Sequence, residues 1–196
     1  MASSEDIGSH DAKTFADRLE KGQSQLRDGA NARQPVDCGH FDMRIARDGT
    51  WFYRGTPIRR PALVKLFATV LKRDGDGGFW LETPVERGRI DVDDAPFLAI
   101  ELSVDGQGHD QRLTFRTNLD ESVTAGPDHA LRVETNAATG EPSPYIEVRA
   151  GLEALIARQV YYELVELGTA DPKDGDKYGV WSDGRFFPLG QLTEPT

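Results

Sequence analysis

The spacing of apolar residues predicts that the ordered part of the chain begins with a hairpin. Phe41, Met43 and Ile45 alternate with polar or small residues, which is the period of a half-buried strand. Asp48-Gly49 follows, and this dipeptide favours a tight hairpin turn because such turns need positive φ. The segment 51–53 is then expected to return as the second strand.

Two later segments have apolar residues at helical spacing. Pro61 suits the first turn of the first helix, where a missing N–H costs nothing. Its apolar stripe consists of Leu63, Leu66, Phe67, Val70 and Leu71. The second helix is predicted from about Gly151 to Leu167, with a stripe of Leu152, Leu155, Ile156, Val160, Leu164 and Leu167.

The remaining patterned segments read as strands in hairpins. They are 79–83 with 86–90, 97–104 with 111–118, 131–135, 145–148, and 178–181 with 185–189. The order of helix, Asp-Gly-Asp, aromatic residue and hairpin occurs twice, from Asp74 and from Asp174. The sequence therefore predicts an α+β fold of two similar small domains. Each is expected to be a helix packed on a short antiparallel sheet, with repeated strand-helix-hairpin motifs.

The expected domain organisation has three parts. Residues 1–37 form a polar arm with a weak helix over 11–27, 38–95 form an N-terminal α+β domain, and 96–196 form a C-terminal α+β domain. A cleft between two similar halves is a common place for a ligand.

Composition and charge limit the classes of molecule that the protein is expected to bind. The 196 residues include 23 Lys and Arg against 33 Asp and Glu, a net charge of −10, which disfavours binding to nucleic acid. No apolar run approaches the roughly 20 residues of a membrane helix, and the first ten residues lack the apolar core of a signal peptide. Cys38 is the single cysteine, so no intramolecular disulfide forms. We expect a cytoplasmic protein that binds neither nucleic acid nor membrane. The sequence leaves open whether it forms homo-oligomers.

Candidate metal motifs are incomplete. A calcium loop needs a bidentate carboxylate at position 12, where counting from Asp74 gives Val85 and counting from Asp174 gives Arg185. Cys38-Gly39-His40 has no second pair of ligands in the spacing that zinc needs. We expect neither a metal nor another cofactor.

Polar residues at strand ends are the best candidates for ligand binding. Arg116 and Asn118 alternate on one face of their strand, and the guanidinium suits a phosphate or carboxylate. Trp80, Thr83 and Arg87 flank the turn at Pro84, where a ring, a hydroxyl and a cation can converge. The alternative is that Arg116 and Asn118 belong to a solvated outer sheet face.

Several short segments resemble the bacterial family known as domain of unknown function 1285. They include Phe41-Asp42-Met43-Arg44-Ile45, Asp48-Gly49-Thr50-Trp51-Phe52-Tyr53, Gly78-Phe79-Trp80-Leu81, Asp94-Ala95-Pro96-Phe97, Phe115-Arg116-Thr117-Asn118, Gly126-Pro127-Asp128-His129 and Val160-Tyr161-Tyr162-Glu163-Leu164. The resemblance runs from about Cys38 to the C-terminus. It implies a two-domain α+β fold with repeated motifs, a nucleotide-like ligand in the interdomain cleft and a signalling role. It implies no catalytic residues.

We therefore expect a small-molecule binding module, with a nucleotide-like ligand between the halves and a signalling or regulatory role. Two alternatives stay open. One is an enzyme acting in the same cleft, for which His129 with Asp128 or Glu163 is the available acid–base pair. The other is an adaptor that binds proteins through its aromatic ribbons, which would require an exposed apolar patch.

Overall fold

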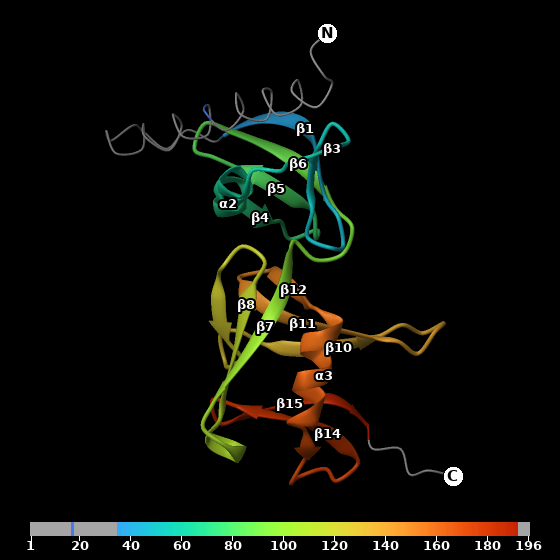
Figure 1. The fold of residues 1–196 in the computed structure, drawn as a ribbon. Helices are drawn as coiled ribbons and strands as arrows, with labels where there is room; N and C mark the ends of the chain where they lie inside the picture. Colours follow the sequence, from blue (N-terminus) through green and yellow to red (C-terminus); the bar gives the residue numbers. More distant parts are fainter. Residues whose placement is uncertain (1–16, 18–34, 192–196) are drawn as a thin grey trace. The chain divides into compact units, whose positions relative to one another are not determined.

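The computed structural model describes Asp17 and residues 35–191 and shows a mostly β protein (Figure 1). The chain divides into two compact units, Met1–Asp94 and Ala95–Thr196, called here the N-terminal and C-terminal units. The helix expected over 11–27 falls outside the described residues, apart from Asp17.

A six-stranded mixed sheet forms the N-terminal unit, in the order β3-β2-β1-β6-β5-β4. The pair β1–β6 is parallel and the other pairs are antiparallel. The elements are β1 (Val36–Ile45), β2 (Trp51–Tyr53), β3 (Thr56–Pro57), α2 (Pro61–Thr69), β4 (Leu71–Arg73), β5 (Phe79–Glu82) and β6 (Glu86–Val92).

The alternation along the strands divides this sheet into an apolar and a polar face. Helix α2 buries Val64, Phe67 and Ala68. The strands contribute buried side chains to the same core, namely Met43, Ile45, Trp51, Leu71, Leu81 and Ile90. Polar residues at the alternate positions of β1, β5 and β6 project from the opposite face.

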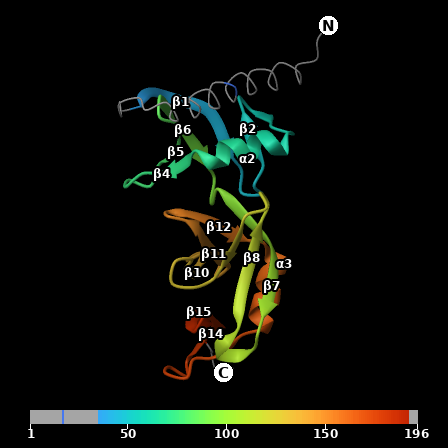
Figure 2. The same ribbon diagram turned by 90° about the vertical axis from the view of Figure 1, so that its left-hand side faces the viewer.

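The C-terminal unit has two sheets. A six-stranded sheet runs in the order β10-β11-β12-β7-β8-β9, and a three-stranded sheet runs β13-β14-β15. The elements are β7 (Phe97–Asp105), η2 (Gly108–Asp110), β8 (Arg112–Thr117), β9 (Ser122–Thr124), β10 (Leu131–Thr135), β11 (Pro142–Arg149), β12 (Leu152–Ile156), α3 (Arg158–Glu166), β13 (Thr169–Ala170), β14 (Lys177–Ser182) and β15 (Arg185–Gln191). Helix α3 runs beside β7 (Figure 2).

A buried hydroxyl joins the two sheets of this unit. Ser182 is 0% exposed at the end of β14. Its Oγ donates to the carbonyl oxygen of Ala125 at 2.7 Å and accepts from the backbone N–H of Leu113 at 3.0 Å. The apolar face of the three-stranded sheet, with Val180 and Phe187, is buried as well. The small sheet is thereby fixed to the larger one.

The predicted fold class is wrong. Instead of a helix on a short antiparallel sheet in each half, each unit contains a large six-stranded mixed sheet, with little helix. Part of the error lies in the second predicted helix, because Leu152–Ile156 is strand β12 and only Arg158–Glu166 is helical. Strand β12 pairs in parallel with β7, and Ala154, Leu155 and Ile156 are all buried. A strand buried on both faces has a continuous apolar run, which resembles a helical stripe.

A recurring order of elements is nevertheless present. A helix, a short strand, a turn and two further strands occur as α2-β4-β5-β6 and again as α3-β13-β14-β15. The two copies pair differently. Strands β4 to β6 belong to the six-stranded sheet of their unit, whereas β13 to β15 form a sheet of their own.

Candidate functional site

A pocket of about 580 Å³ lies in the C-terminal unit, and we call it the C-terminal pocket. It combines aromatic rings, cations and prolines from three separate stretches of chain. Its lining residues are His109, Asp171, Pro172, Lys173, Lys177, Trp181, Gly184, Arg185, Phe186 and Pro188. The volume lies within the 300–1,000 Å³ range typical of small-molecule sites.

The outer face of the three-stranded sheet supplies the floor of the pocket. Trp181 of β14 pairs directly with Phe186 of β15, and their rings meet edge to face at 5.4 Å between centroids. Gly179 lies one step along the same face of β14. A Cβ there would be 2.2 Å from the carbonyl oxygen of Phe187 and 2.7 Å from Cζ of Phe186. Only glycine therefore leaves room for the Phe186 ring on this floor.

A hydrogen bond to its backbone carbonyl oxygen holds Trp181 in place. The side-chain amide of Gln111 donates to the carbonyl oxygen of Trp181 at 2.8 Å, and Gln111 is 6% exposed. The imidazole of His109, on η2, lies against the indole with 4.3 Å between ring centroids. The indole is thus a fixed aromatic surface beside the cations of the pocket.

The cations of the pocket stand out against an acidic background. Residues 95–191 carry eight Lys and Arg against sixteen Asp and Glu, a net charge of −8, yet three of the eight line this pocket. Lys177 pairs with Asp174 at 2.9 Å, and this carboxylate raises the pKa of the lysine. Within residues 35–191, neither Lys173 nor Arg185 forms an ion pair. Asp171 lines the same pocket, and the Arg185 guanidinium lies 5.4 Å from the centroid of the Phe187 ring.

A second hollow, of about 450 Å³ in the N-terminal unit, is a weaker candidate for binding an anion. Its cations face carboxylates, because Arg44 pairs with Asp93 at 2.6 Å and the Nε of Arg54 is 3.8 Å from Asp42. The imidazole of His40 is 3.4 Å from Asp91. Such a balanced surface gives an anion little net attraction.

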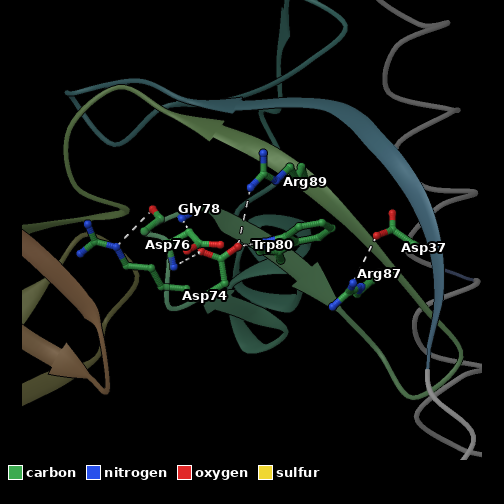
Figure 3. Close-up of polar contacts among 9 residues, drawn as sticks. Asp37, Asp74, Asp76, Gly78, Trp80, Arg87 and Arg89 are labelled. Carbon is green, nitrogen blue, oxygen red and sulfur yellow. Dashed lines mark hydrogen bonds and ion pairs between the residues drawn. The ribbon is translucent and has the colours of Figure 1, made fainter.

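Two of the predicted site residues meet on the polar face of the N-terminal sheet. The guanidinium of Arg87 lies 4.7 Å from the centroid of the Trp80 ring, and Arg89 lies 5.1 Å from it (Figure 3). Arg87 also pairs with Asp37 at 3.3 Å. Arg89 is 3.7 Å from Asp74. Each arginine thus has both an aromatic and an acidic neighbour.

The Asp74 carboxylate organises this cluster. It accepts hydrogen bonds from the indole N–H of Trp80 at 2.7 Å and from the backbone N–H groups of Gly78 at 2.6 Å and Asp76 at 3.1 Å (Figure 3). The Trp80 and Gly78 hydrogen bonds hold the pKa of Asp74 below its ordinary value of 3.8. The first Asp-Gly-Asp segment therefore closes the turn between β4 and β5 and fixes the Trp80 ring.

The other predicted site residues have evident structural contacts. Thr83 is 3% exposed, and its hydroxyl donates to the carbonyl oxygen of Glu86 at 2.9 Å. In the C-terminal unit, Arg116 contacts Glu101 with two nitrogens and Asp120 at 2.9 Å, and these carboxylates raise its pKa. Asn118 accepts from the backbone N–H of Leu98 at 3.1 Å through Oδ1.

The sequence correctly predicted that Trp80 and Arg87 lie together. A ligand contacted by all five predicted residues, Arg116, Asn118, Trp80, Thr83 and Arg87, stays a prediction. The sequence-based prediction missed His109, Lys173, Lys177, Arg185 and Phe186. One signal was present, since Lys177 and Trp181 share a face of β14 opposite the buried Val180. The acid–base pair suggested for an enzyme, His129 with Asp128 or Glu163, stays a prediction, and His129 Nδ1 contacts the backbone oxygen of Glu147 at 2.9 Å.

Two findings concern metals and membranes. In the described part of the chain, no three His, Cys, Asp or Glu side chains gather closely enough to hold a metal ion. Among the same residues, the helices are too short or too polar to span a membrane.

Comparison with known proteins shows the family of this mostly β, two-unit protein. The N-terminal domain model of the domain of unknown function family DUF1285 matches residues 31–95, and its C-terminal domain model matches 96–189. The chain therefore belongs to the DUF1285 family, as its motifs suggested.

Two solved structures of the family are similar to the chain. A DUF1285 family protein from Silicibacter pomeroyi is 52% identical, with a TM-score of 0.76, and the match covers 81% of this chain and 85% of the other. A DUF1285 family protein from Shewanella baltica is 28% identical, with a TM-score of 0.49 over 63% of this chain and 90% of the other. No functionally curated protein matches the sequence.

Proposed function

We propose that this protein is a small-molecule binding module whose ligand is nucleotide-like, with a planar ring and an anionic group, and that it binds in the C-terminal pocket. The observation that carries the proposal is that two cations, Lys173 and Arg185, line the same pocket as the Trp181 and Phe186 rings, with the Arg185 guanidinium 5.4 Å from the centroid of the Phe187 ring. The cations form no ion pair within residues 35–191. The proposal rests on this pocket rather than on the five residues chosen from the sequence.

The chemistry of the pocket fits such a ligand in two ways. Offset or edge-to-face aromatic contacts favour a planar ring beside Trp181. Lys173 and Arg185 supply charge-assisted hydrogen bonds to a phosphate or carboxylate, and these are about twice as strong as neutral ones. Because the surrounding unit has a net charge of −8, only a local group of cations can attract an anion here.

The proposed role is regulatory, with the bound ligand rather than a reaction as the output. We place the protein in the reducing cytoplasm, where a single cysteine needs no disulfide partner and nucleotides are available.

A calorimetric titration tests the proposal. Purified protein is titrated with a panel of nucleoside phosphates, the matching nucleosides and pyrophosphate. We expect a nucleoside phosphate to bind and its nucleoside to bind at least about tenfold more weakly, because a charge-assisted hydrogen bond is worth about 1.5–3 kcal/mol. At 100 times its dissociation constant, the ligand should stabilise the fold by about 2.7 kcal/mol.

Matched variants connect that binding to the pocket. Lys173→Ala and Arg185→Gln should each weaken binding about tenfold or more. Arg112→Gln should leave it unchanged, since Arg112 is an exposed arginine of the same unit, outside the pocket and without an ion pair in the described chain. Failure of the whole panel to bind, or an equal effect of all three variants, overturns the proposal.

A further inference from the structure

We infer that His109 occupies the stacking surface of Trp181 as an internal competitor, and that the planar ring of the ligand binds by displacing it. The inference rests on the proposed function, and it assigns His109 of the same pocket the role of blocking the ring site until the ligand displaces it. The imidazole lies 4.3 Å from the indole centroid at an interplanar angle of 41°, and both rings line the pocket. A ligand ring that stacks on this part of Trp181 therefore competes with the imidazole.

The His109 side chain is weakly held apart from this contact. It is 61% exposed and lies beside Gly184, and its Nδ1 is 3.2 Å from the carboxylate of Asp110, which is 95% exposed. An exposed pair between sequence neighbours costs little to break. The stacking contact with Trp181 is thus the main interaction that the ligand must replace.

The segment around His109 is short and contains two glycines. His109 lies on the three-residue η2, which is preceded by Gly106 at φ 78° and begins with Gly108 at φ 58°. Glycine crosses between positive and negative φ at little cost, so these positions allow η2 to swing. A Cβ at Gly108 would meet no atom within 4 Å, whereas one at Gly106 would lie 3.1 Å from the backbone oxygen of Asp110.

Trp181 itself stays in place when η2 moves. The anchor is Gln111, directly after η2, which is buried and holds the Trp181 carbonyl oxygen. The backbone of Gln111 also accepts from the N–H of Asp183 at 2.9 Å. Movement therefore stops at Gln111, so that the imidazole leaves and the indole remains.

This arrangement predicts a difference between ligands with and without a ring. A nucleoside phosphate must displace His109, so its measured affinity is lowered by the strength of the His109–Trp181 contact. Pyrophosphate engages Lys173 and Arg185 alone and has no ring to place on Trp181. Removing the imidazole should therefore favour the first ligand and leave the second unaffected.

The experiment compares His109→Ala with the wild-type protein by calorimetry, using the tightest nucleoside phosphate of the panel and pyrophosphate. We expect the nucleoside phosphate to bind about two- to tenfold more tightly, the range of a single aromatic pair, and pyrophosphate to bind equally well. The control is His40→Ala, which removes an exposed histidine of the N-terminal unit and should change neither affinity.

An NMR measurement keeps the inference testable if the variant perturbs the fold. In the free wild-type protein, the ring protons of His109 should be shifted upfield by the indole, and saturating nucleoside phosphate should return them to ordinary positions. Weaker binding of both ligands by His109→Ala would show a direct contact with the anion and overturn the inference. So would unchanged His109 shifts on binding. A panel that does not bind at all rejects the proposed function instead.

Discussion

The buried hydroxyl of Ser182 offers a decisive test of how the C-terminal unit is held together. We predict that Ser182→Ala, which removes one atom from a residue that is 0% exposed, strongly destabilises this unit. The substitution deletes two hydrogen bonds, at 2.7 Å to Ala125 and at 3.0 Å from Leu113.

The magnitude follows from these contacts. The Leu113 N–H becomes a buried donor without a partner, which costs about 1–3 kcal/mol, and the hydrogen bond to Ala125 adds about 1 kcal/mol. The expected loss is therefore about 2–4 kcal/mol in the free energy of unfolding. For a unit of this size, that corresponds to a fall of about 10 °C or more in the melting temperature.

Urea denaturation followed by circular dichroism measures the change, and calorimetry resolves whether the two units unfold in separate transitions. Only the transition of the C-terminal unit should shift. Ser103→Ala is the matched control, since Ser103 is an exposed serine on β7 of the same unit, and it should stay within about 0.5 kcal/mol of wild type. If Ser182→Ala and Ser103→Ala are equally stable, the hydroxyl does not clamp the two sheets.

Two further predictions concern Asp74, from the first Asp-Gly-Asp motif, and Arg116, one of the site residues chosen from the sequence. Because hydrogen bonds lower the pKa of Asp74 below 3.8, its contribution to stability is complete above that pH and is lost as the pH falls through the lowered value. Asp74→Asn should therefore lower the melting temperature of the N-terminal unit at pH 7 and flatten its decline below about pH 4, as measured by thermal scans across pH. Arg116→Lys should lower the melting temperature of the C-terminal unit and leave ligand affinity intact, because Arg116 contacts Oε2 of Glu101 with two nitrogens and also binds Asp120. Reduced affinity at an unchanged melting temperature would instead make Arg116 a ligand contact.

Local patterns in the sequence predicted local structure well. The alternation at Met43 and Ile45 gives a strand with both side chains buried, and Pro61 begins a helix. The predicted secondary structure is wrong where a strand pairs with another strand far away in the sequence. Strand β12 pairs in parallel with the distant β7, and Ala154, Leu155 and Ile156 are all buried, so the alternation that would mark it as a strand disappears.

The candidate site was harder to predict for a similar reason. His109 reaches Trp181 only because η2 contacts β14, and no short motif contains both residues. Whether Lys173 and Arg185 form ion pairs within residues 35–191 depends on which carboxylates lie near them in space. Trp80 and Arg87 were recognised together because they belong to adjacent antiparallel strands, where sequence distance and spatial distance agree.

The two parallel strand pairs also set the order in which the chain becomes foldable during synthesis. In each unit, the first strand pairs with a strand that is synthesised much later. Val36 of β1 pairs with Glu86 of β6, and Phe97 of β7 pairs with Ala154 of β12. Neither sheet can close until that partner has left the ribosome, and contacts of such long range slow folding. Until then, β1 and β7 each have an unpaired edge, so a nascent chain stalled before either partner is the form most exposed to aggregation.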